Sequence, residues 1–447
     1  MSFELYEYKI EDLGKVITGK TPPSKISDAF SAQGIPFVTP KDMDGRRLID
    51  KTERYLSSQG VEAVRNCLLP QNSIAVSCIG SDMGKTVLLP GESITNQQIN
   101  AIVVDSEHFD YKYVYYYLST LQDDFKAIAG GSATPILNKG HFSQFKVSLP
   151  VKPVQNKIAL ILDSLDTKIE VNTEINHTLE QMAQALFKSW FVDFEPVKAK
   201  MAVLESGGSQ ADAMLAAMTA ISGKDADALA VFEREHPEQY AELKATAELF
   251  PSAMQDSELG NIPVTWELGK LQDLLVLQRG FDLPSSARKD GEFPLIAASG
   301  PNGTHNVAMA KAPGVITGRS GVLGKVYLTL EDYWPLNTTL WVKEFKRATP
   351  CYAYELLRLL DMKAFNAGSA VPSLNRNHIH SLSYPLPPMA LVNLFESSAL
   401  LLHQRAHVNL KHSQSLALLR DTLLPKLLSG EITLPEAELA VSEAENV

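Results

Sequence analysis

Two long stretches of the sequence carry apolar residues at spacings of three and four, as the buried stripe of a helix requires. The first runs from Pro153 to Trp190, and its pattern returns 237 residues later. A helix of about 38 residues would be roughly 55 to 60 Å long, which is typical of a coiled coil. We therefore expect the two helices to pack on each other. The stripes consist of Ile158, Leu162, Leu165, Ile169, Ile175, Leu179, Met182 and Leu186, and of Phe395, Ala399, Leu402, Ala406, His412, Leu416, Leu419 and Leu423.

Asn172 and Asn409 occupy equivalent positions on the two stripes. A polar residue on the seam of a coiled coil specifies the register of the helices at some cost in stability. We expect these asparagines to form a matched pair that sets the register. The alternative is that two unrelated surface helices share the pattern by chance.

The stretches that precede the two helices also match each other, so the chain contains one globular unit and one helix, each written twice. The offset between the copies falls from 261 to 237 along the unit, so the second copy is shorter in its middle. This is the pattern expected of one scaffold that carries two different recognition surfaces. The matches are Lys9, Asp12, Leu13, Gly19 and Pro23 with Lys270, Asp273, Leu274, Gly280 and Pro284; Gly84, Lys85 and Asn96 with Gly324, Lys325 and Asn337; and Gly131, Ser132, Ala133, Pro135, Leu137, Asn138 and His141 with Gly368, Ser369, Ala370, Pro372, Leu374, Asn375 and His378.

Local patterns indicate an α+β fold for each globular unit. Strands are predicted at 73–79, 86–89, 314–317 and 326–330, with glycine-containing turns between the members of each pair. Helices are predicted at 113–129 and 351–365, and polar loops at 40–47 and 284–291.

The chain divides into six predicted segments: a first recognition domain (1–150), the first long helix (151–196), a helical insertion (197–260), a second recognition domain (261–388), the second long helix (389–431) and an acidic tail (432–447). Ser209 is a suitable N-cap for a helix in the insertion, and Pro237 a suitable first residue of another. The tail is expected to fray.

Charge is distributed unevenly along the chain. Of the net charge of −11, the insertion carries −6 and the tail −4, whereas residues 261–388 carry +3. The global charge therefore does not exclude binding of a polyanion by a folded face. The three cysteines are far apart, which argues against a disulfide framework or a zinc site. The N-terminus lacks the apolar region of a signal peptide and no run approaches a membrane span, so we expect a cytoplasmic protein.

Motifs for catalysis are missing. The stretch Gly80 to Thr86 resembles a phosphate-binding loop but is one residue too short, and a strand-like run follows it where a helix should begin. HExxH, GxSxG, GxGxxG and the [DNS]PP[FYW] tetrapeptide of amino-methyltransferases are absent, and the histidines form no ligand cluster. We expect no catalytic residue, metal or cofactor in this chain.

For DNA contact the candidates are basic and amide side chains on the loops, because phosphates attract Lys and Arg while Arg, Asn and Gln read base edges. The candidates are Lys41, Arg46, Arg47, Lys85, Asn138, Lys139, Arg279, Arg288, Lys289, Arg319, Lys325, Asn375 and Arg376. Any of them could instead be solvated surface charge, and Asn138 and Asn375 could simply cap helices. The tyrosines at 113 and 117 are spaced for a helical core rather than for base stacking.

The order of globular unit, long helix, globular unit and long helix resembles the specificity subunit of a Type I restriction-modification enzyme. The paired GSAxPxLN stretches at 131–138 and 368–375 and the ending LLPKLLSGEI at 423–432 carry the resemblance, which covers almost the whole chain.

The resemblance implies two target-recognition domains that each read half of a split, asymmetric DNA sequence, with the antiparallel helices as a ruler between them. It implies a non-catalytic chain that binds double-stranded DNA, two modification (methyltransferase) subunits and restriction subunits. S-adenosylmethionine, ATP and Mg would belong to those partners. The alternatives are a stand-alone DNA-binding regulator and a stand-alone enzyme. The role of 197–260 stays open.

Overall fold

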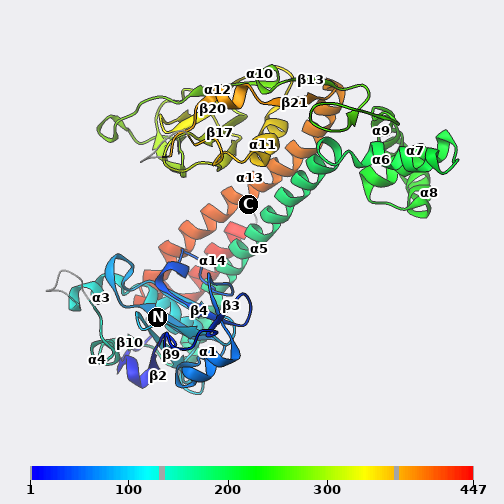
Figure 1. Cartoon of the computed structure of the whole chain (residues 1–447). Coiled ribbons are helices and arrows are strands. Elements are labelled where there is room, and N and C mark those ends of the chain that lie inside the picture. The colour runs from blue at the N-terminus through cyan, green and yellow to red at the C-terminus, as the bar shows by residue number, and fades with distance from the viewer. Residues whose placement is uncertain (1–2, 130–135, 367–371, 446–447) are drawn as a thin grey trace. The chain divides into compact units, whose positions relative to one another are not determined.

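The computed structural model describes residues 3–129, 136–366 and 372–445 of the chain (Figure 1). The chain forms two compact units, which we treat separately. Unit 1 comprises residues 1–172 and 411–447, and unit 2 comprises residues 173–410. Each unit therefore contains one of the two globular stretches and a part of each long helix.

The centre of unit 1 is a four-stranded antiparallel sheet with the strand order β2-β9-β6-β7. Apolar residues occupy both faces of β6 and most of β9, as expected for central strands that are covered on both sides. The strands are β2 (Gly14–Thr18), β6 (Ser73–Ser77), β7 (Thr86–Leu89) and β9 (Ile99–Val104).

Helix α2 (Tyr111–Ser119) contributes the fully buried side chains of Tyr113, Val114 and Leu118 to the core of unit 1. Tyr113 is thus a core residue, as its spacing predicts. The remaining elements of the globular stretch are β1 (Tyr6–Lys9), β3 (Phe30–Ser31), β4 (Ile35–Val38), β5 (Tyr55–Leu56), α1 (Ser58–Ala63), β8 (Ile94–Thr95), α3 (Gln122–Ile128), α4 (Lys139–Ser143) and β10 (Lys146–Leu149).

Unit 2 repeats this sheet, with the order β14-β20-β17-β18. The predicted strands are confirmed in both units to within two residues, and α11 (Pro350–Leu359) takes the place of α2. The predicted helix at 113–129 is broken into α2 and α3. The elements are β13 (Glu267–Lys270), α10 (Leu271–Leu274), β14 (Leu275–Arg279), β15 (Phe293–Ala297), β16 (Gly300–His305), β17 (Gly314–Gly318), β18 (Val326–Thr329), β19 (Trp334–Pro335), β20 (Thr339–Phe345), α11, α12 (Arg376–His380) and β21 (Ser383–Leu386).

The middles of the two copies differ, as the shrinking offset predicts. In unit 1 a small sheet of order β3-β5-β4-β8 is accompanied by helix α1. In unit 2 the corresponding sheet is β16-β15-β19, which is built on an antiparallel hairpin. Each small sheet also contains one parallel pair of strands, β4 with β8 in unit 1 and β15 with β19 in unit 2.

Two of the repeated residues have the same structural task in both copies. The carboxylates of Asp12 and Asp273 accept the backbone N–H of Lys9 and Lys270, each at 2.7 Å, and so cap the short helices that follow. Gly19 and Gly280 approach the backbone of a neighbouring turn so closely that an added Cβ would lie 2.2 Å from the carbonyl oxygen of Asn96 or Leu336. Only glycine fits there.

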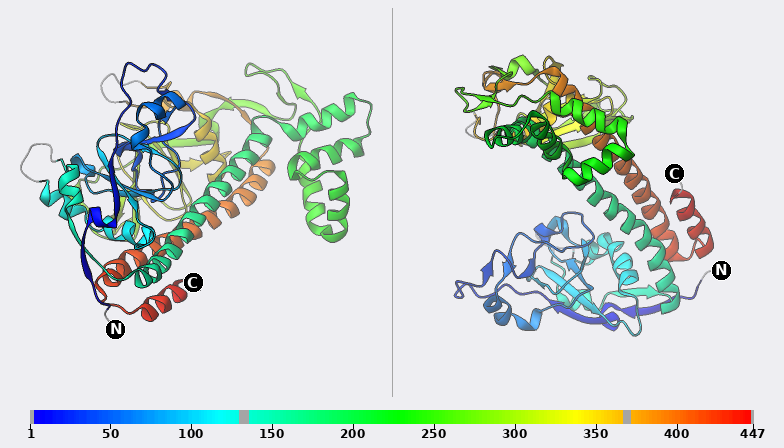
Figure 2. Two further views of the ribbon diagram at one scale, coloured as in Figure 1. Left: turned by 90° about the horizontal axis from the view of Figure 1, so that it is seen from below. Right: turned by 90° about the vertical axis from the view of Figure 1, so that its right-hand side faces the viewer.

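Helices α5 (Lys152–Phe191) and α13 (Met389–Ser429) are continuous over 40 and 41 residues and pack side by side (Figure 2). Within unit 1 the amide nitrogen of Asn172 donates to Ser413 Oγ at 3.2 Å, and within unit 2 that of Asn409 donates to Asn176 Oδ1 at 3.0 Å. Moving four residues forward along α5 thus means moving four residues back along α13. The pairing is antiparallel.

The predicted pairing of Asn172 with Asn409 is wrong in detail. Both asparagines lie on the seam, but they do not contact each other. Asn172 contacts Ser413, one turn after Asn409, and Asn409 contacts Asn176, one turn after Asn172. In an antiparallel pair, equivalent positions are adjacent only at the centre of the seam. The repeat therefore generates two equivalent polar pairs instead of one.

The predicted stripe is also partly wrong. Ile158, Leu162 and Leu165 are fully buried, but Ile175 and Met182 are 41% and 52% exposed. Ala183, Phe187 and Trp190 are buried instead, so the seam is displaced by one residue in the second part of α5. The pattern in the sequence follows a strict 3.5-residue repeat. An α-helix has 3.6 residues per turn, so its buried face drifts away from that repeat along the helix.

The insertion is helical, as predicted, with α6 (Glu195–Glu205), α7 (Gln210–Ser222), α8 (Ala226–Glu235) and α9 (Pro237–Glu248) grouped together in Figure 1. Ser209 caps α7 through a capping box, and Pro237 is the first residue of α9. Lys200 is buried, and its ammonium donates to the carbonyl oxygens of Ala247 and Phe250 at 2.7 and 2.6 Å. This lysine satisfies carbonyls at the C-terminal end of α9. The strands β11 (Met254–Gln255) and β12 (Ile262–Pro263) follow.

The acidic tail is not frayed, contrary to prediction. Residues Leu434–Glu445 form helix α14, and Ala437 and Val441 are buried in the core of unit 1. Thr433 and Glu436 cap its start, since the carboxylate of Glu436 accepts the Thr433 N–H at 2.9 Å. A single apolar stripe on an otherwise acidic segment is sufficient to hold it in place.

The three cysteines are free thiols. In the part of the chain that the structure describes, no helix has both the length and the apolar character needed to cross a bilayer.

Candidate nucleic-acid interface

Several loops of unit 1 meet at one end of its four-stranded sheet. The last residue of β2, Thr18, lies opposite Asn100 in β9, and the last residue of β6, Ser77, lies opposite Ile99. Strand β7 begins at the same level, with Thr86 opposite Val76. The segments that follow β2, precede β9 and connect β6 with β7 therefore lie together at this end.

Backbone hydrogen bonds hold further segments against the same end. The Lys20 N–H donates to Thr95 O at 2.9 Å, the Asn96 N–H to Val38 O at 3.0 Å, and the Leu137 N–H to Cys78 O at 3.0 Å. The loops after β4 and before α4 are thereby added to the group. We define the unit 1 edge as Lys20, Thr21, Lys41, Lys85, Gln97, Asn138 and Lys139.

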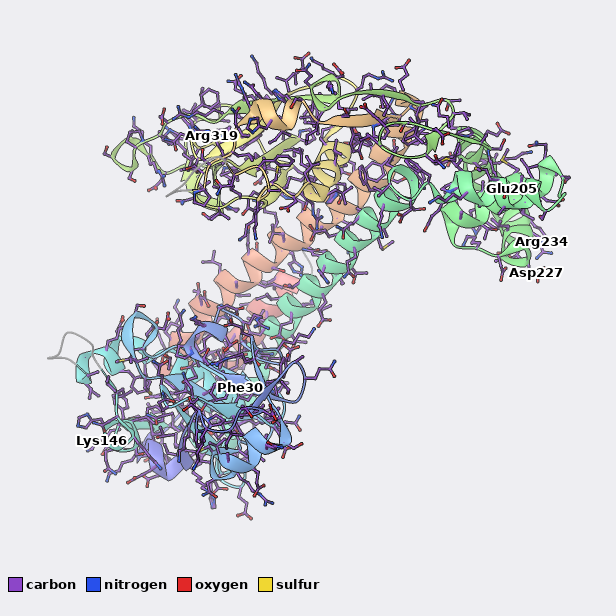
Figure 3. All side chains as sticks on the ribbon, in the orientation of Figure 1. Phe30, Lys146, Glu205, Asp227, Arg234 and Arg319 are labelled. Carbon is purple, nitrogen blue, oxygen red and sulfur yellow. The ribbon has the colours of Figure 1, made fainter. Side chains whose placement is uncertain are left out.

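The same end of the unit 2 sheet is built in the same way. Arg279 is the last residue of β14, opposite Leu340, and the turn between β17 and β18 begins at Arg319. The Leu374 N–H donates to Arg319 O at 2.9 Å and brings the segment before α12 to this end. We define the unit 2 edge as Arg279, Asp282, Arg319, Lys325, Asn337, Asn375 and Arg376; Figure 3 labels Arg319 beside the strands.

The predicted residues of the unit 1 edge differ in exposure and in whether their polar groups already have partners within the chain. Lys41 and Lys139 are exposed. The Lys85 ammonium already contacts Asp82 at 2.7 Å and Met43 O at 3.3 Å. Asn138 caps α4 by accepting the His141 N–H at 2.9 Å, which is the alternative role that the sequence leaves open. The Gly-Ser-Ala segments of the GSAxPxLN stretches, at 131–133 and 368–370, lie outside the described residues.

Arg46 and Arg47 make ion pairs with residues outside the unit 1 edge. Arg46 is exposed and contacts Asp44 and Asp50 at 3.0 and 3.4 Å. Its hydrogen bond holds the pKa of the Asp44 carboxyl below the usual range. Arg47 is a correction: its side chain is only 11% exposed and points toward α5 instead of toward solvent.

Arg47 is the centre of a network of ion pairs that joins four segments of unit 1. Its guanidinium contacts Asp163 at 2.6 Å, Glu170 at 2.9 Å and the Tyr116 hydroxyl at 3.2 Å. Asp166, which also accepts from Tyr116 at 2.6 Å, is held by Arg420 of α13 at 2.5 Å. Burial disfavours the charge of Arg47, but the bonds to Glu170 and Asp163 outweigh this and raise its pKa. Arg47 is thus a structural cation.

In unit 2 five predicted residues lie on the edge. Arg279 and Lys325 are exposed, and Arg319 is half-buried with its guanidinium 3.5 Å from Asn337 O. Arg376 is exposed, and Asn375 caps α12 by accepting the Asn377 N–H at 2.9 Å.

Arg288 and Lys289 instead lie beside the small sheet of unit 2. The Arg288 guanidinium donates to Asn302 Oδ1 at 3.1 Å, and the Lys289 N–H donates to the His305 ring at 3.1 Å.

Sequence reasoning missed Lys20, Thr21 and Gln97 in unit 1 and Asp282 in unit 2. Thr21 donates its hydroxyl proton to Gln97 Oε1 at 2.7 Å, so these two residues from separate loops act together. A signal was present, because Lys20 and Thr21 follow the repeated Gly19, Asp282 is two residues after the repeated Gly280, and Gln97 directly follows the repeated Asn96. Residue type alone does not distinguish Lys20 from other surface lysines.

The chemistry of the two edges consists of ammonium, guanidinium and amide groups, which position phosphates and read base edges. Among the described residues, the side chains grouped closely enough to hold a metal are Asp105, Glu107 and His108, which are all exposed. They lie at the opposite end of β9 from the edge. The sequence that resembles a phosphate-binding loop leads directly into β7 at Thr86, so it has no helix N-terminus to offer a phosphate.

The sequence of this chain is similar to those of known proteins. The family model described as Type I restriction modification DNA specificity domain matches residues 4–181. A specificity subunit of the HindI Type I restriction enzyme from Haemophilus influenzae is 32% identical over 323 residues, which cover 65% of this chain and 70% of the relative. That of the MjaIX enzyme from Methanocaldococcus jannaschii is 25% identical over 441 residues, or 96% and 93% of the two chains.

A crystal structure of the S subunit of a Type I restriction-modification system from M. genitalium has a similar fold. It aligns with 95% of this chain and 96% of its own length, with a TM-score of 0.52 at 16% identity. The fold, the family model and the relatives agree with the resemblance found in the sequence. The chain belongs to the family of Type I restriction enzyme specificity subunits.

Proposed function

We propose that this chain is the non-catalytic subunit that gives a Type I restriction-modification enzyme its DNA sequence specificity. Each unit reads one half of a split, asymmetric target with the edge of its sheet. The long helices serve as the ruler between the half-sites, and the chain recruits modification and restriction subunits.

The observation that supports this proposal most directly is that one edge is built twice on one strand order, with different side chains. The unit 1 edge presents lysines together with Thr21 and Gln97, whereas the unit 2 edge presents three arginines and one lysine. Lysine binds phosphate as a point charge, while arginine and glutamine offer directional hydrogen bonds to base edges. Two different edges on one scaffold suit two unlike half-sites.

The antiparallel helix pair supports the ruler. Antiparallel pairing of repeated elements generates a pseudo-two-fold relationship, which is how dimeric DNA-binding proteins address two half-sites on one duplex. Helices of 40 and 41 residues would span roughly 60 Å at 1.5 Å per residue, more than one turn of DNA.

The partners follow from the proposal. The chain would assemble with two modification subunits and with restriction subunits. The S-adenosylmethionine, ATP and Mg needed for methylation, translocation and cleavage would be bound by those subunits. The described residues of this chain contribute DNA-binding and docking surfaces only.

Mapping N6-methyladenine in DNA from cells that express this chain with its modification subunits tests the proposal. A split motif with a fixed unspecified gap is expected. Exchanging residues 1–150 for the matching domain of another specificity subunit should alter one half-site and leave the other unchanged. A contiguous motif, or a motif that the exchange leaves intact, would contradict the proposal.

A further inference from the structure

We propose that Arg279 selects a guanine in the half-site read by unit 2, and that Asp282 and Asn337 are positioning residues that orient its guanidinium. The inference rests on the proposed function and adds to it the base and the residue that reads it.

The backbone around Arg279 is fixed. Arg279 ends β14, and directly after it the Gly280 N–H donates to Thr339 O at 3.1 Å and the Phe281 N–H to Pro335 O at 2.8 Å. Gly280 lies so close to Leu336 O that no side chain fits at position 280. The Arg279 side chain nevertheless remains 52% exposed. An exposed side chain on a rigid base loses less entropy on binding than one on a mobile loop.

The guanidinium of Arg279 is held from one side. One of its terminal nitrogens lies 3.2 and 3.4 Å from the two carboxylate oxygens of Asp282. The amide nitrogen of Asn337 donates to the same carboxylate and holds it in turn. The other terminal nitrogen and Nε of Arg279 make no hydrogen bond with the described part of the chain. Each terminal nitrogen carries two N–H groups, so the nitrogen that contacts Asp282 keeps a second N–H for a ligand. Together with the free terminal nitrogen or with Nε, this N–H forms a fork of two parallel donors.

Guanine is the base that matches these donors. In the major groove it presents two adjacent acceptors, N7 and O6, which the fork of an arginine contacts with two parallel hydrogen bonds. Adenine presents one acceptor and one donor at these positions, and the donor would face the guanidinium.

The paired carboxylate argues against a phosphate contact. The charge of Asp282 offsets that of Arg279 and would repel the DNA backbone, so the pair would release little counterion. Lys325 on the same edge is exposed and has no carboxylate among the ion pairs of the described residues, which suits it to a phosphate. Arg279 and Lys325 therefore have different tasks.

Unit 1 lacks this group. Its counterpart of Arg279 is Thr18, since Gly19 corresponds to Gly280. The Thr18 hydroxyl lies 2.6 Å from Asn100 Oδ1 and is used inside the sheet. Arg279 is thus a feature by which the two half-sites would differ.

The test uses the full chain with its modification subunits and maps methylated motifs for Arg279→Ala, Arg279→Lys, Asp282→Asn and, as the control, Lys325→Ala. In Arg279→Ala and Arg279→Lys we expect one guanine of the half-site assigned to residues 261–388 to become degenerate. Discrimination at that base pair should fall roughly tenfold to a hundredfold, measured as methylation rates on duplexes with each base. Asp282→Asn should weaken discrimination at the same base pair by less. Lys325→Ala should slow methylation without changing the motif.

Methylation that still depends on the unaltered first half-site shows that each variant is folded. A motif unchanged in Arg279→Ala, or a wild-type discrimination retained in Arg279→Lys, would overturn the inference while leaving the split-target function intact. Degeneracy in the other half-site would overturn it as well. Absence of a split motif in the wild-type protein would instead reject the proposed function itself.

Discussion

Arg47 faces Asp163, Asp166 and Glu170, three carboxylates on α5, at 2.6, 3.9 and 2.9 Å. Without Arg47, Asp163 keeps Lys112 and Asp166 keeps Arg420, but Glu170, whose side chain is 36% exposed, loses this cation. At the scale of single residues, replacing Arg47 should therefore lower the stability of the fold without changing the affinity for DNA.

We expect Arg47→Met to lower the free energy of unfolding by about 2 kcal/mol, because the carboxylates lose charge-assisted hydrogen bonds. Arg46→Met, which removes an exposed neighbour, should change it by less than about 0.5 kcal/mol. Urea unfolding followed by circular dichroism measures both. The salt dependence of DNA binding should be unchanged in Arg47→Met; a lower slope would mean that Arg47 contacts a phosphate after all.

Glu355 of α11 gives a pH-dependent prediction. Its side chain is 1% exposed and lies 3.5 Å from Arg358, and burial raises its pKa to about 7. Because the folded state then holds its proton up to a higher pH than the unfolded state, stability falls as pH rises from about 4.5 through 7 and stays reduced above that. Glu355→Gln removes this loss.

Above pH 7 we expect Glu355→Gln to be more stable than the wild type by roughly 2 kcal/mol, with a difference that vanishes near pH 5. Urea unfolding between pH 5 and 8 measures the difference. His403, whose pKa is lowered by burial, adds a slope of opposite sign to both proteins and cancels in the comparison. A variant that is equally stable at all pH values would show that Glu355 is ionised in the folded state at neutral pH.

At the scale of elements, the polar contacts of the helix pair should specify the register and reduce stability. Asn409 is 5% exposed and donates to Asn176. We expect Asn409→Ala to cost about 1 kcal/mol by leaving the Asn176 amide without this partner. The double variant Asn176→Leu/Asn409→Leu should be more stable than the wild type. A double variant less stable than the wild type would contradict this assignment.

Helix α14 offers a matched pair of substitutions on one element. Val441 is 8% exposed and Leu439 is 61% exposed. Val441→Lys should lower the free energy of unfolding by roughly 2 kcal/mol, because it replaces a buried apolar side chain by a charge. Leu439→Lys should have little effect. Thermal unfolding of the two variants decides whether α14 is docked, and equal melting temperatures would show that it is not.

At the scale of the whole molecule, the ruler can be shortened. Residues 169–175 and 410–416 face each other in the observed antiparallel register. Removing both segments deletes seven residues from each helix and retains the heptad phase. If the helices set the gap, it should shrink by about three base pairs, since seven residues rise about 10.5 Å and one base pair about 3.4 Å. Mapping methylated motifs measures this gap.

Removing 169–175 alone is the control, because it places the two seams out of register and should abolish methylation instead of shortening the gap. A double deletion that methylates the original motif with an unchanged gap would reject the ruler and leave the reading of the half-sites by the two edges untouched.

The repeats made much of the architecture predictable. Gly19 with Gly280 and Asp12 with Asp273 recur because a close backbone approach and a helix cap each require one residue type. Strands such as β7 could be located because their patterns are local. The direction in which the Arg47 side chain points could not be predicted, because an arginine is equally suitable on a surface and in a buried ion-pair network.

The sequence alone determined that this chain has two copies of an α+β unit and a long helix, and it identified the family, because repeats, caps and apolar periodicity are written locally. Tertiary structure decided which loops meet at the sheet edges, which asparagines pair along the seam and whether the tail is docked. These outcomes depend on contacts between residues far apart in the chain, as between Arg47 and Glu170 or Asp282 and Asn337, and no local pattern encodes them.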